Sequence, residues 1–402
     1  MKIGHFSFSS FGGAGKVASS LHQYQLEKGF DSSFFSLNTE NLSSNPLRYP
    51  LLTSLAIADK YVVGKKSNPS MFSFLRNRHS FKRIVSKISD VDVVHLHWIP
   101  GIIKIGDLQI RSVRRQKFFW SIHDMWPFTG GCHYAGSCTK FQEKCSSCPQ
   151  VNFGFKTQIE KEFDKKFFHL NFLRNRMTLV FPSKFIEKKA KESKILSDFH
   201  SVVIANPVKI MSQSTLSSKN YFEVRPPNNN SIVLGLVAGD LSEKRKNVLE
   251  LISWWQRYFN ELQSNVSILL IGNNGSFAQR VKGVTVMSGI KESENMNEVY
   301  SAMSLHISLS REETFGYSIV ESGLMGVPSI CYSHTAQSEL VSDHETGFVI
   351  NKIDELKPLL TELLPRKDFI YRTGINAKKK YELNFSQSTI GDKYLDLYTS
   401  ST

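Results

Sequence analysis

The sequence predicts an α/β protein built from two domains of similar size. Its 402 residues exceed what a single compact hydrophobic core usually holds. Hydrophobic residues make up 41% of the chain and charged residues 21%, a balance typical of globular rather than disordered proteins. Short apolar runs alternate with segments of helical periodicity along the chain, and this alternation is typical of parallel sheets covered by helices.

The first predicted strand, Lys2 to Ser7, leads into a glycine-rich loop from Ser9 to Lys16 and then into a helical run. A strand, a glycine-rich loop and a helix in this order let the backbone approach a diphosphate closely. The loop has neither the Gly-Lys-Ser/Thr end of a P-loop nor the G-x-G-x-x-G spacing of dinucleotide-binding domains. A plain tight turn would also account for its glycines.

Two histidines come at the ends of later predicted strands. His97 ends the strand 91–97, and His123 follows the strand Lys117 to Ile122. Ligands of open parallel sheets bind beyond the carboxyl ends of the strands, so we expect both histidines at that edge. A hydrogen-bonded structural role is the alternative for a histidine, and for His97 it is the preferred interpretation.

Four of the five cysteines lie close together, at Cys132, Cys138, Cys145 and Cys148. A cytoplasmic chain disfavours disulfides, and the Cys145-x2-Cys148 pair with two further thiols nearby suits a tetrahedral structural zinc. The gaps between the other cysteines depart from paired C-x2-C spacing. Free thiols and a pair of disulfides are therefore the alternatives to zinc.

The predicted boundary between the domains is a polar linker at residues 207–230, which begins after Asn206. We assign residues 1–206 to the first domain and residues 231–384 to the second. The second domain opens on a fully apolar strand, 232–239, suited to a sheet covered on both faces. Further strands are predicted at 266–271, 284–287, 305–309, 329–332 and 347–350. Residues 385–402 form an amphipathic helical tail.

One turn of the second domain carries two carboxylates, Glu313 and Glu321. The run Leu305 to Leu309 has the pattern of a strand, and Ser318 to Met325 has helical apolar spacing. The turn between them should therefore be a helix N-terminus, which favours anions. Two solvated glutamates on a helix are the alternative interpretation.

The segment Ser310 to Pro328 resembles the E-x7-E motif of retaining glycosyltransferases with the GT-B fold. The resemblance extends over nearly the whole chain, and the segment His123 to Tyr134 with the cysteines that follow is similar to a subgroup found in exopolysaccharide and lipopolysaccharide gene sets. It implies two Rossmann-like domains that face each other across a cleft. The first would bind the acceptor and the second a nucleotide-sugar donor, and the C-terminal helix would cross back to the first domain.

The resemblance also implies roles for single residues. Glu313 would contact the donor sugar near the reacting carbon, and His123 would contact the same sugar and orient or charge-stabilise the transfer. Glu321 would bind the ribose hydroxyls, and His97 and Asp124 would lie on the acceptor side. The remaining donor-binding residues implied are Gly12, Gly13, Arg245, Lys246, Phe315, Gly316 and Tyr317. Two positions depart from the family pattern, because Asp240 replaces an Arg and Asn247 replaces a Gly.

The function implied is retaining transfer of a hexose from a nucleotide-diphosphate sugar to a glycan or lipid-linked acceptor in cell-surface polysaccharide synthesis. No catalytic cofactor is implied, and structural zinc is the one metal considered. A sugar-nucleotide epimerase or phosphorylase on the same fold is the alternative enzyme. A nucleic-acid partner is not expected, because the positive charge is not combined with a recognised binding module.

The net charge of +14 is concentrated in two basic regions, 59–87 and 156–194. They suit an anionic membrane surface or a phosphate-bearing acceptor, and exposed helix faces that keep the chain soluble are the alternative. No apolar run approaches the ~20 residues that span a bilayer. The first residues run into a strand pattern without a signal peptide. We therefore expect a cytoplasmic protein, with peripheral contact at the inner membrane face left open.

Overall fold

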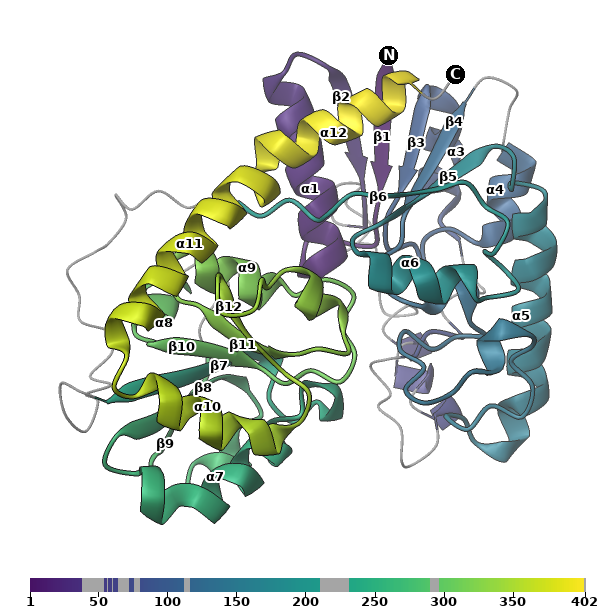
Figure 1. The fold of residues 1–402 in the computed structure, drawn as a ribbon. Helices are drawn as coiled ribbons and strands as arrows, with labels where there is room; N and C mark the ends of the chain where they lie inside the picture. The colour runs from purple at the N-terminus through teal and green to yellow at the C-terminus, as the bar shows by residue number, and fades with distance from the viewer. Residues whose placement is uncertain are drawn as a thin grey trace. The chain divides into compact units, whose positions relative to one another are not determined.

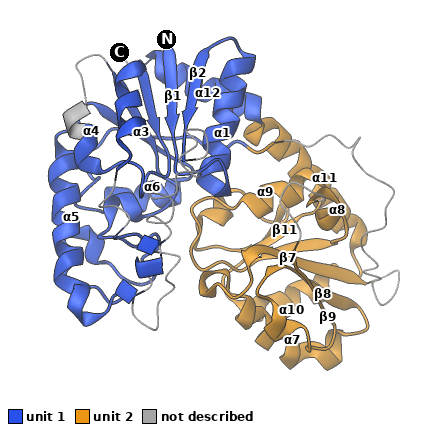
Figure 2. Cartoon of the chain, turned by 180° about the vertical axis from the view of Figure 1, so that it is seen from behind, with its two compact units in different colours: residues 1–207, 387–402 blue, residues 208–386 orange. Residues whose placement is uncertain are grey.

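The computed structural model describes residues 1–37, 80–111, 116–209, 231–289 and 296–400, with short stretches between 54 and 75. The chain divides into two compact units. Unit 1 comprises residues 1–207 and 387–402, and unit 2 comprises residues 208–386 (Figure 2). Most of the predicted linker and part of the basic region 59–87 lie outside the described residues.

Unit 1 is built on a six-stranded parallel sheet in the order β2-β1-β3-β4-β5-β6 (Figure 1). The strands are β1 (Lys2–Phe6), β2 (Asp31–Phe35), β3 (Val93–Leu96), β4 (Lys117–Ser121), β5 (Met177–Phe181) and β6 (Ser201–Val203). Because β2 and β3 lie on opposite sides of β1, the order reverses between β1 and β3. Such a switch point is where open α/β sheets bind ligands, at the carboxyl ends of the strands.

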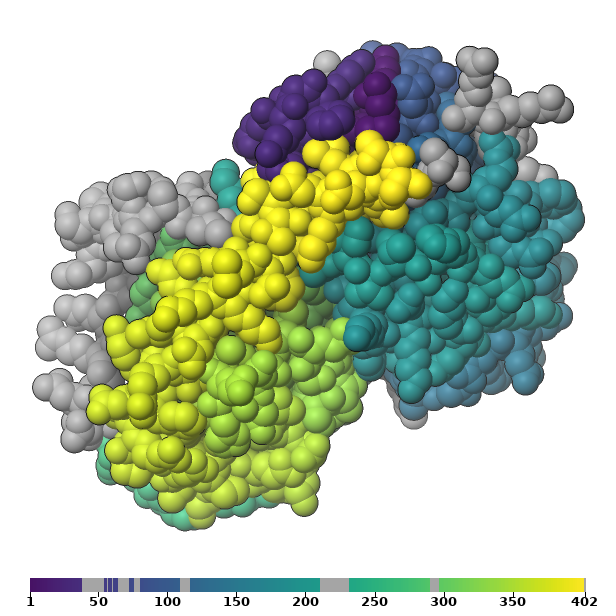
Figure 3. Space-filling model, turned by 45° about the horizontal axis from the view of Figure 1, so that its top comes forward, coloured from purple at the N-terminus to yellow at the C-terminus, as the bar shows by residue number. Residues whose placement is uncertain are grey.

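Helices cover both faces of this sheet, as buried apolar strands require. They are α1 (Gly12–Glu27), α3 (Lys82–Lys87), α4 (Ile105–Arg111), α5 (Lys156–Asn171), α6 (Lys184–Lys191) and α12 (Gln387–Ser400). The last helix lies beside the first, and Figure 3 shows it in yellow against the purple N-terminal segment. A Cβ added to Gly391 would lie 2.1 Å from the ring of Tyr24, so glycine is what allows α12 to approach α1 this closely.

Unit 2 contains a second six-stranded parallel sheet, in the order β12-β11-β10-β7-β8-β9. Its strands are β7 (Ile232–Asp240), β8 (Val266–Asn273), β9 (Val284–Met287), β10 (Leu305–Ser308), β11 (Ser329–Tyr332) and β12 (Gly347–Ile350). Its helices are α7 (Val248–Leu262), α8 (Met296–Ser301), α9 (Tyr317–Leu324), α10 (Leu356–Leu363) and α11 (Lys367–Phe385). The order of this sheet reverses between β7 and β10.

The predicted fold class is confirmed, since two parallel sheets are each covered by helices. Every predicted strand is present, although several are shorter than the apolar run that indicated them. The strand predicted at 91–97, for example, is hydrogen-bonded as a strand only from Val93 to Leu96. No helix among the described residues is both long and apolar enough to cross a bilayer.

Candidate active site

The switch point of unit 2 brings together the basic pair and the first glutamate of the E-x7-E motif. Arg245 and Lys246 lie in a short 3-10 helix, η9 (Lys244–Lys246), after β7, and Glu313 follows the neighbouring strand β10. One carboxylate oxygen of Glu313, Oε2, accepts hydrogen bonds from the Arg245 guanidinium and from Lys246 Nζ, each at 2.8 Å. Glu313 comes 68 positions after Arg245 and 67 positions after Lys246 in the sequence. The three side chains meet because β7 and β10 are neighbours in the sheet.

The charges around Glu313 determine its protonation. Burial favours the neutral acid, but Arg245 and Lys246 outweigh burial and lower the pKa of Glu313 to about 2. Glu313 is therefore an anion at neutral pH, with its charge balanced by two cations.

Arg245 and Lys246 differ in how exposed each side chain is and in how many hydrogen bonds it donates to the protein. Arg245 also donates to Glu243 at 2.8 Å and to the carbonyl of Glu312, and its side chain is 12% exposed. Lys246 is 22% exposed, and its ammonium group has three N–H donors, one of which reaches Glu313. Arg245 thus supports Glu313 as part of the local structure, and Lys246 is the better placed of the two to meet an incoming anion.

The backbone explains one of the two departures from the family pattern. Asn247 has a φ of 61°, in the left-handed region that glycine adopts easily and asparagine tolerates better than most residues. Asn is therefore compatible with a position where the family has Gly. Asp240 accepts hydrogen bonds from the backbone N–H and the hydroxyl of Ser242, so it stabilises the turn after β7 rather than supplying the usual cation.

The predicted helix start is present, with α9 beginning at Tyr317 directly after Gly316, whose φ is 119°. Phe315 is buried beneath this turn. Glu321 lies in the middle of α9, and its carboxylate accepts a hydrogen bond of 2.7 Å from the hydroxyl of Tyr300. Tyr300 was not identified from the sequence, because an aromatic residue in an amphipathic helix gives no signal beyond burial.

In unit 1, the glycine-rich loop lies after β1 at the other switch point. Helix α1 begins at Gly12, which has a φ of 72°, and Gly13 follows in its first turn. A Cβ at Gly15 would lie 2.5 Å from the carbonyl oxygen of Ser9, so this third glycine lets the loop fold back onto the helix. The loop is thus more than a plain turn, although its proximity to phosphate stays a prediction.

His123 follows β4 and is linked to His97, whose Nδ1 lies 3.2 Å from its Nε2. Burial lowers the pKa of His123 to about 4, against a weaker opposing effect of Asp124. His97 is 2% exposed and lies between His5 and His123, with both ring nitrogens hydrogen-bonded. These contacts fit the structural alternative for His97, and its acceptor-side role stays a prediction.

Asp124 also has a local role in this structure. Its Oδ2 accepts hydrogen bonds from His133 Nδ1 at 2.6 Å and from the Trp98 indole at 3.1 Å, and its Oδ1 accepts from the backbone N–H of Trp126. Three donors thus engage the carboxylate, which is 9% exposed. The side chain thus helps to organise the loop after β4, and the acceptor-side role of Asp124 stays a prediction.

A buried lysine of α5 holds the same loop. Lys166 Nζ donates to the carbonyls of Trp126 and Thr129 at 2.7 and 2.9 Å and lies 3.8 Å from the centre of the Trp126 ring. Burial lowers its pKa to about 8, so the ammonium form still predominates at neutral pH. Nothing in the sequence distinguishes Lys166, because it lies within a run of charged residues.

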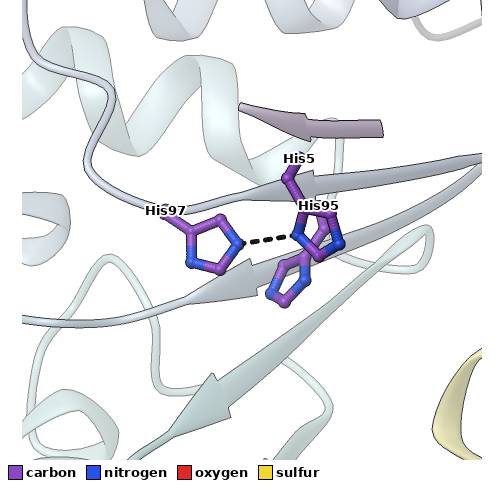
Figure 4. A group of neighbouring side chains, drawn as sticks. All are labelled: His5, His95 and His97. Atoms are coloured by element: carbon purple, nitrogen blue, oxygen red, sulfur yellow. Dashed lines mark hydrogen bonds between the residues drawn. The ribbon is translucent and has the colours of Figure 1, made fainter. Parts of the chain in front are cut away.

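The four clustered cysteines are all described, and each is a free thiol. Within the described residues, the one group of three or more His, Cys, Asp or Glu ligand atoms lying within 4.8 Å of one another is His5, His95 and His97 (Figure 4). Structural zinc at these four thiols stays a prediction.

Residues 233–365 match the sequence model of a protein family described as group 1 glycosyl transferases. This segment contains Arg245, Lys246, Glu313 and Glu321. The chain carries a group 1 glycosyl transferase domain. The prediction of a glycosyltransferase is therefore confirmed, and the E-x7-E motif and the retaining mechanism stay predictions.

Relatives support the same assignment over part of the chain. WcaC of Escherichia coli (strain K12), named as a colanic acid biosynthesis glycosyl transferase, is 24% identical over 157 residues. Trehalose synthase of Thermococcus litoralis is 26% identical over 120 residues. These matches cover 35% and 30% of this chain and only 37% and 29% of the two relatives.

Solved structures show the fold over the full length. Anabaena Alr3699/HepE in complex with UDP has a TM-score of 0.62 at 16% identity, with all of both chains covered. WaaG, a glycosyltransferase involved in lipopolysaccharide biosynthesis, has a TM-score of 0.58 at 12% identity, with 99% of this chain and all of WaaG covered. The group 1 domain of this chain thus belongs to a two-domain GT-B fold.

We predict that stability falls with acid because of the buried histidines of unit 1. His5 and His123 have pKa values lowered by burial to about 4, whereas an unfolded histidine titrates near 6.5. The unfolded chain therefore binds more protons between these values. The stabilisation is complete above pH 6.5 and is lost as the pH falls toward 4, by up to about 1.4 kcal/mol per pH unit for each such histidine. Urea unfolding between pH 7 and 5.5 measures this slope.

The matched variants are His5→Gln, which removes one buried group, and His200→Gln, which removes an exposed histidine. His5→Gln should reduce the dependence on pH, whatever its effect on stability at pH 7, and His200→Gln should leave it unchanged. Equal slopes in the wild type and His5→Gln would contradict this account.

Proposed function

We propose that this protein is a retaining glycosyltransferase that uses a nucleotide-diphosphate sugar. The observation that carries the proposal is the ion cluster of Glu313 with Arg245 and Lys246 at the switch point of a group 1 glycosyl transferase domain. The complexes of Alr3699/HepE with UDP and with UDP-glucose support a nucleotide-sugar donor for a chain of the same fold.

The proposed chemistry is electrostatic. When the bond between the sugar and the diphosphate breaks, negative charge develops on the departing nucleotide and must be stabilised in a site that excludes water. Lys246 and the start of α9 at Gly316 and Tyr317 are the groups assigned to this charge. Glu313, held as an anion by Arg245 and Lys246, is assigned to the donor sugar near its reacting carbon.

Two further residues complete the proposed donor site. Glu321, oriented by Tyr300, is assigned to the ribose hydroxyls, because a carboxylate can accept two hydrogen bonds from a vicinal diol. His123 is assigned to the donor sugar from unit 1. The mechanism would need no catalytic metal, because the chain supplies the cations itself.

The proposed biological role is cell-surface polysaccharide synthesis with a glycan or lipid-linked acceptor. It rests on the names of WcaC and WaaG, which are associated with colanic acid and with lipopolysaccharide. Nucleotide release from uridine and guanosine diphosphate sugars, measured with and without acceptor, identifies the donor. Conversion of the sugar without any acceptor would favour the epimerase alternative.

We predict that Glu313→Gln lowers the transfer rate by about 100-fold or more. The amide keeps the shape of the side chain but removes the charge that Arg245 and Lys246 hold next to the reacting carbon. His123→Ala should also abolish transfer. Both rates are measured as nucleotide released and glycoside formed.

Glu345→Gln is the matched control, because Glu345 is an exposed glutamate of the same unit. It should retain the wild-type rate. Circular dichroism and thermal unfolding should show that all three variants are folded. Wild-type transfer by Glu313→Gln or His123→Ala would remove that residue from the mechanism.

We further propose that an aromatic and basic patch on unit 1 contacts an anionic membrane surface. Phe168 and Phe172 are 57% and 55% exposed, and their ring centres are 5.1 Å apart on one side of the end of α5. Phe167 is also exposed, and Lys194 Nζ lies 5.2 Å from its ring. Exposed aromatic rings with lysines around them suit the interface of an anionic bilayer.

Phe168→Glu should weaken binding to vesicles that contain phosphatidylglycerol by about 10-fold, because it removes buried apolar area and adds a repelled charge. Sedimentation with vesicles measures the bound fraction. Phe277→Glu, at an exposed phenylalanine of unit 2, is the control and should bind as the wild type does. No binding by the wild type, or equal loss in both variants, would refute the patch.

A further inference from the structure

Among the described residues, the two most exposed aromatic side chains belong to neighbouring segments of unit 1. Phe153 is 87% exposed and Tyr61 is 74% exposed. Ile57, four positions before Tyr61, is 50% exposed. We call these three side chains the apolar patch. Single exposed apolar residues are common on proteins, but a group of them marks a surface that contacts something else.

Hydrogen bonds fix the two segments of the apolar patch to each other, although they are far apart in sequence. Val63 and Val151 form an antiparallel bridge, and both side chains are buried. The side-chain amide of Asn152 donates to the carbonyl of Tyr61 at 2.7 Å and to that of Val63 at 3.2 Å. Phe153 follows Asn152 directly. The junction therefore holds the backbone in place while the rings of the patch stay in solvent.

The apolar patch lies toward the edge of the sheet where the strands end. Strands β4 and β5 are parallel neighbours, so α5 between them must return the chain from the carboxyl edge to the amino edge. Phe153 precedes the start of α5, whereas Phe172 follows its end, about 24 Å away. Figure 1 shows α5 running along the flank of unit 1. The patch is thus on the side of His123 and the glycine-rich loop.

The basic region that contains Tyr61 contributes cations and no exposed acid. Residues 59–87 hold eight Lys or Arg and a single acid, Asp59. Asp59 is 1% exposed, and its carboxylate accepts hydrogen bonds from the backbone N–H groups of Phe74 at 3.2 Å and Leu75 at 2.7 Å. The only acid of this region is therefore used inside the protein.

The second basic region begins beside Phe153 and continues along α5. Lys156 places its ammonium group 5.4 Å from the centre of the Phe153 ring. Exposed residues at the three- and four-residue spacing of one helix face follow: Lys161, Lys165 and Phe168. Two acids of the helix pair with Lys144, Glu160 at 2.8 Å and Asp164 at 3.6 Å. The two basic regions thus meet at the apolar patch.

We propose that the apolar patch inserts into the surface of an anionic lipid bilayer, and that the acceptor of the transfer is carried on a lipid of that bilayer. The inference rests on the proposed function and selects a lipid-linked acceptor over a soluble glycan. Exposed aromatic rings suit the boundary between headgroups and acyl chains, and lysines suit phosphate headgroups. A bilayer at this end of α5 presents its lipids beside the carboxyl edge of the sheet.

A second copy of this chain is the other occupant that an apolar patch suggests, and the charge disfavours it. A symmetric dimer places the same surface of both copies together. The basic regions that meet at the patch would then face each other, and juxtaposed like charges oppose association. An anionic bilayer offers the opposite charge together with an apolar interior, so it complements both properties of the patch.

Phe153→Trp in the full-length protein tests insertion directly. Bromine-labelled acyl chains quench the fluorescence of an indole that enters the bilayer. With vesicles of phosphatidylcholine and phosphatidylglycerol, we expect the fluorescence added by this substitution to shift to the blue and to lose about half or more of its intensity. With phosphatidylcholine alone the quenching should be much weaker, because the lysines have no anionic partner.

Tyr371→Trp is the matched control, because Tyr371 is a 68% exposed aromatic residue of unit 2. The fluorescence that it adds should not be quenched. No quenching in Phe153→Trp, equal quenching in the two variants, or equal quenching with and without phosphatidylglycerol would overturn the inference. So would a dimer in solution that Phe153→Ser dissociates.

The acceptor is tested with radiolabelled nucleotide sugar and vesicles that contain total lipid from bacterial membranes. The label should appear in a product that organic solvent extracts. Phe153→Ser combined with Tyr61→Ser should lower this incorporation about 10-fold or more, with nucleotide binding unchanged. Label found only in water-soluble products would overturn the lipid-linked acceptor. Failure of the wild type to bind any nucleotide would count against the proposed function and leave the quenching result intact.

Discussion

The carboxylate of Glu313, held between Arg245 and Lys246, is the interaction on which the proposed site depends. A buried anion without partners would be costly, and two cations at 2.8 Å offset that cost. The parallel sheet makes this arrangement possible, because β7 and β10 are adjacent and end at the same edge. The turn after each strand then needs only a few residues to bring the charges together.

Unit 1 has the same kind of parallel sheet, but it must stabilise buried polar side chains. Its sheet has a polar layer of histidines where a parallel sheet usually has aliphatic residues. The layer is tolerated because α1 and α12 supply hydrogen-bond partners, among them Gln25 and Tyr398. Hydrogen bonds among buried side chains favour one arrangement of the side chains that make them. The C-terminal helix thus contributes to this polar layer through the hydrogen bond of Tyr398 to His95, although it lies far from β3 in the sequence.

The sequence predicted the fold class and the strands named in the sequence analysis, because strand and helix periodicities are local properties that tertiary packing did not override here. The family resemblance assigned Glu313, Arg245 and Lys246 to one donor site, but it did not predict the direct ion pairs of Glu313 with the two cations. It did not separate the roles of Arg245 and Lys246, because their difference lies in the contacts of Arg245 with Glu243 and Glu312.

Other parts of the site could not be found from the sequence. His5, Gln25 and Tyr300 matter through partners that are distant in sequence, and no spacing indicates such pairs. The strand pattern Val93-Val-His-Leu-His97 did contain a usable signal, since two histidines at alternate positions of a buried strand share one face. The cysteine spacing suggested zinc, and this stays a prediction, since the four described cysteines are free thiols.

The most direct test of the central claim is calorimetric titration of the full-length protein with UDP, GDP and ADP. The account predicts that at least one of them binds, that Lys246→Ala weakens this binding by about 10-fold or more, and that Lys244→Ala, at an exposed neighbour, does not. Absence of binding by all three nucleotides, or equal weakening by the two substitutions, would contradict a diphosphate site at Lys246 and Glu313.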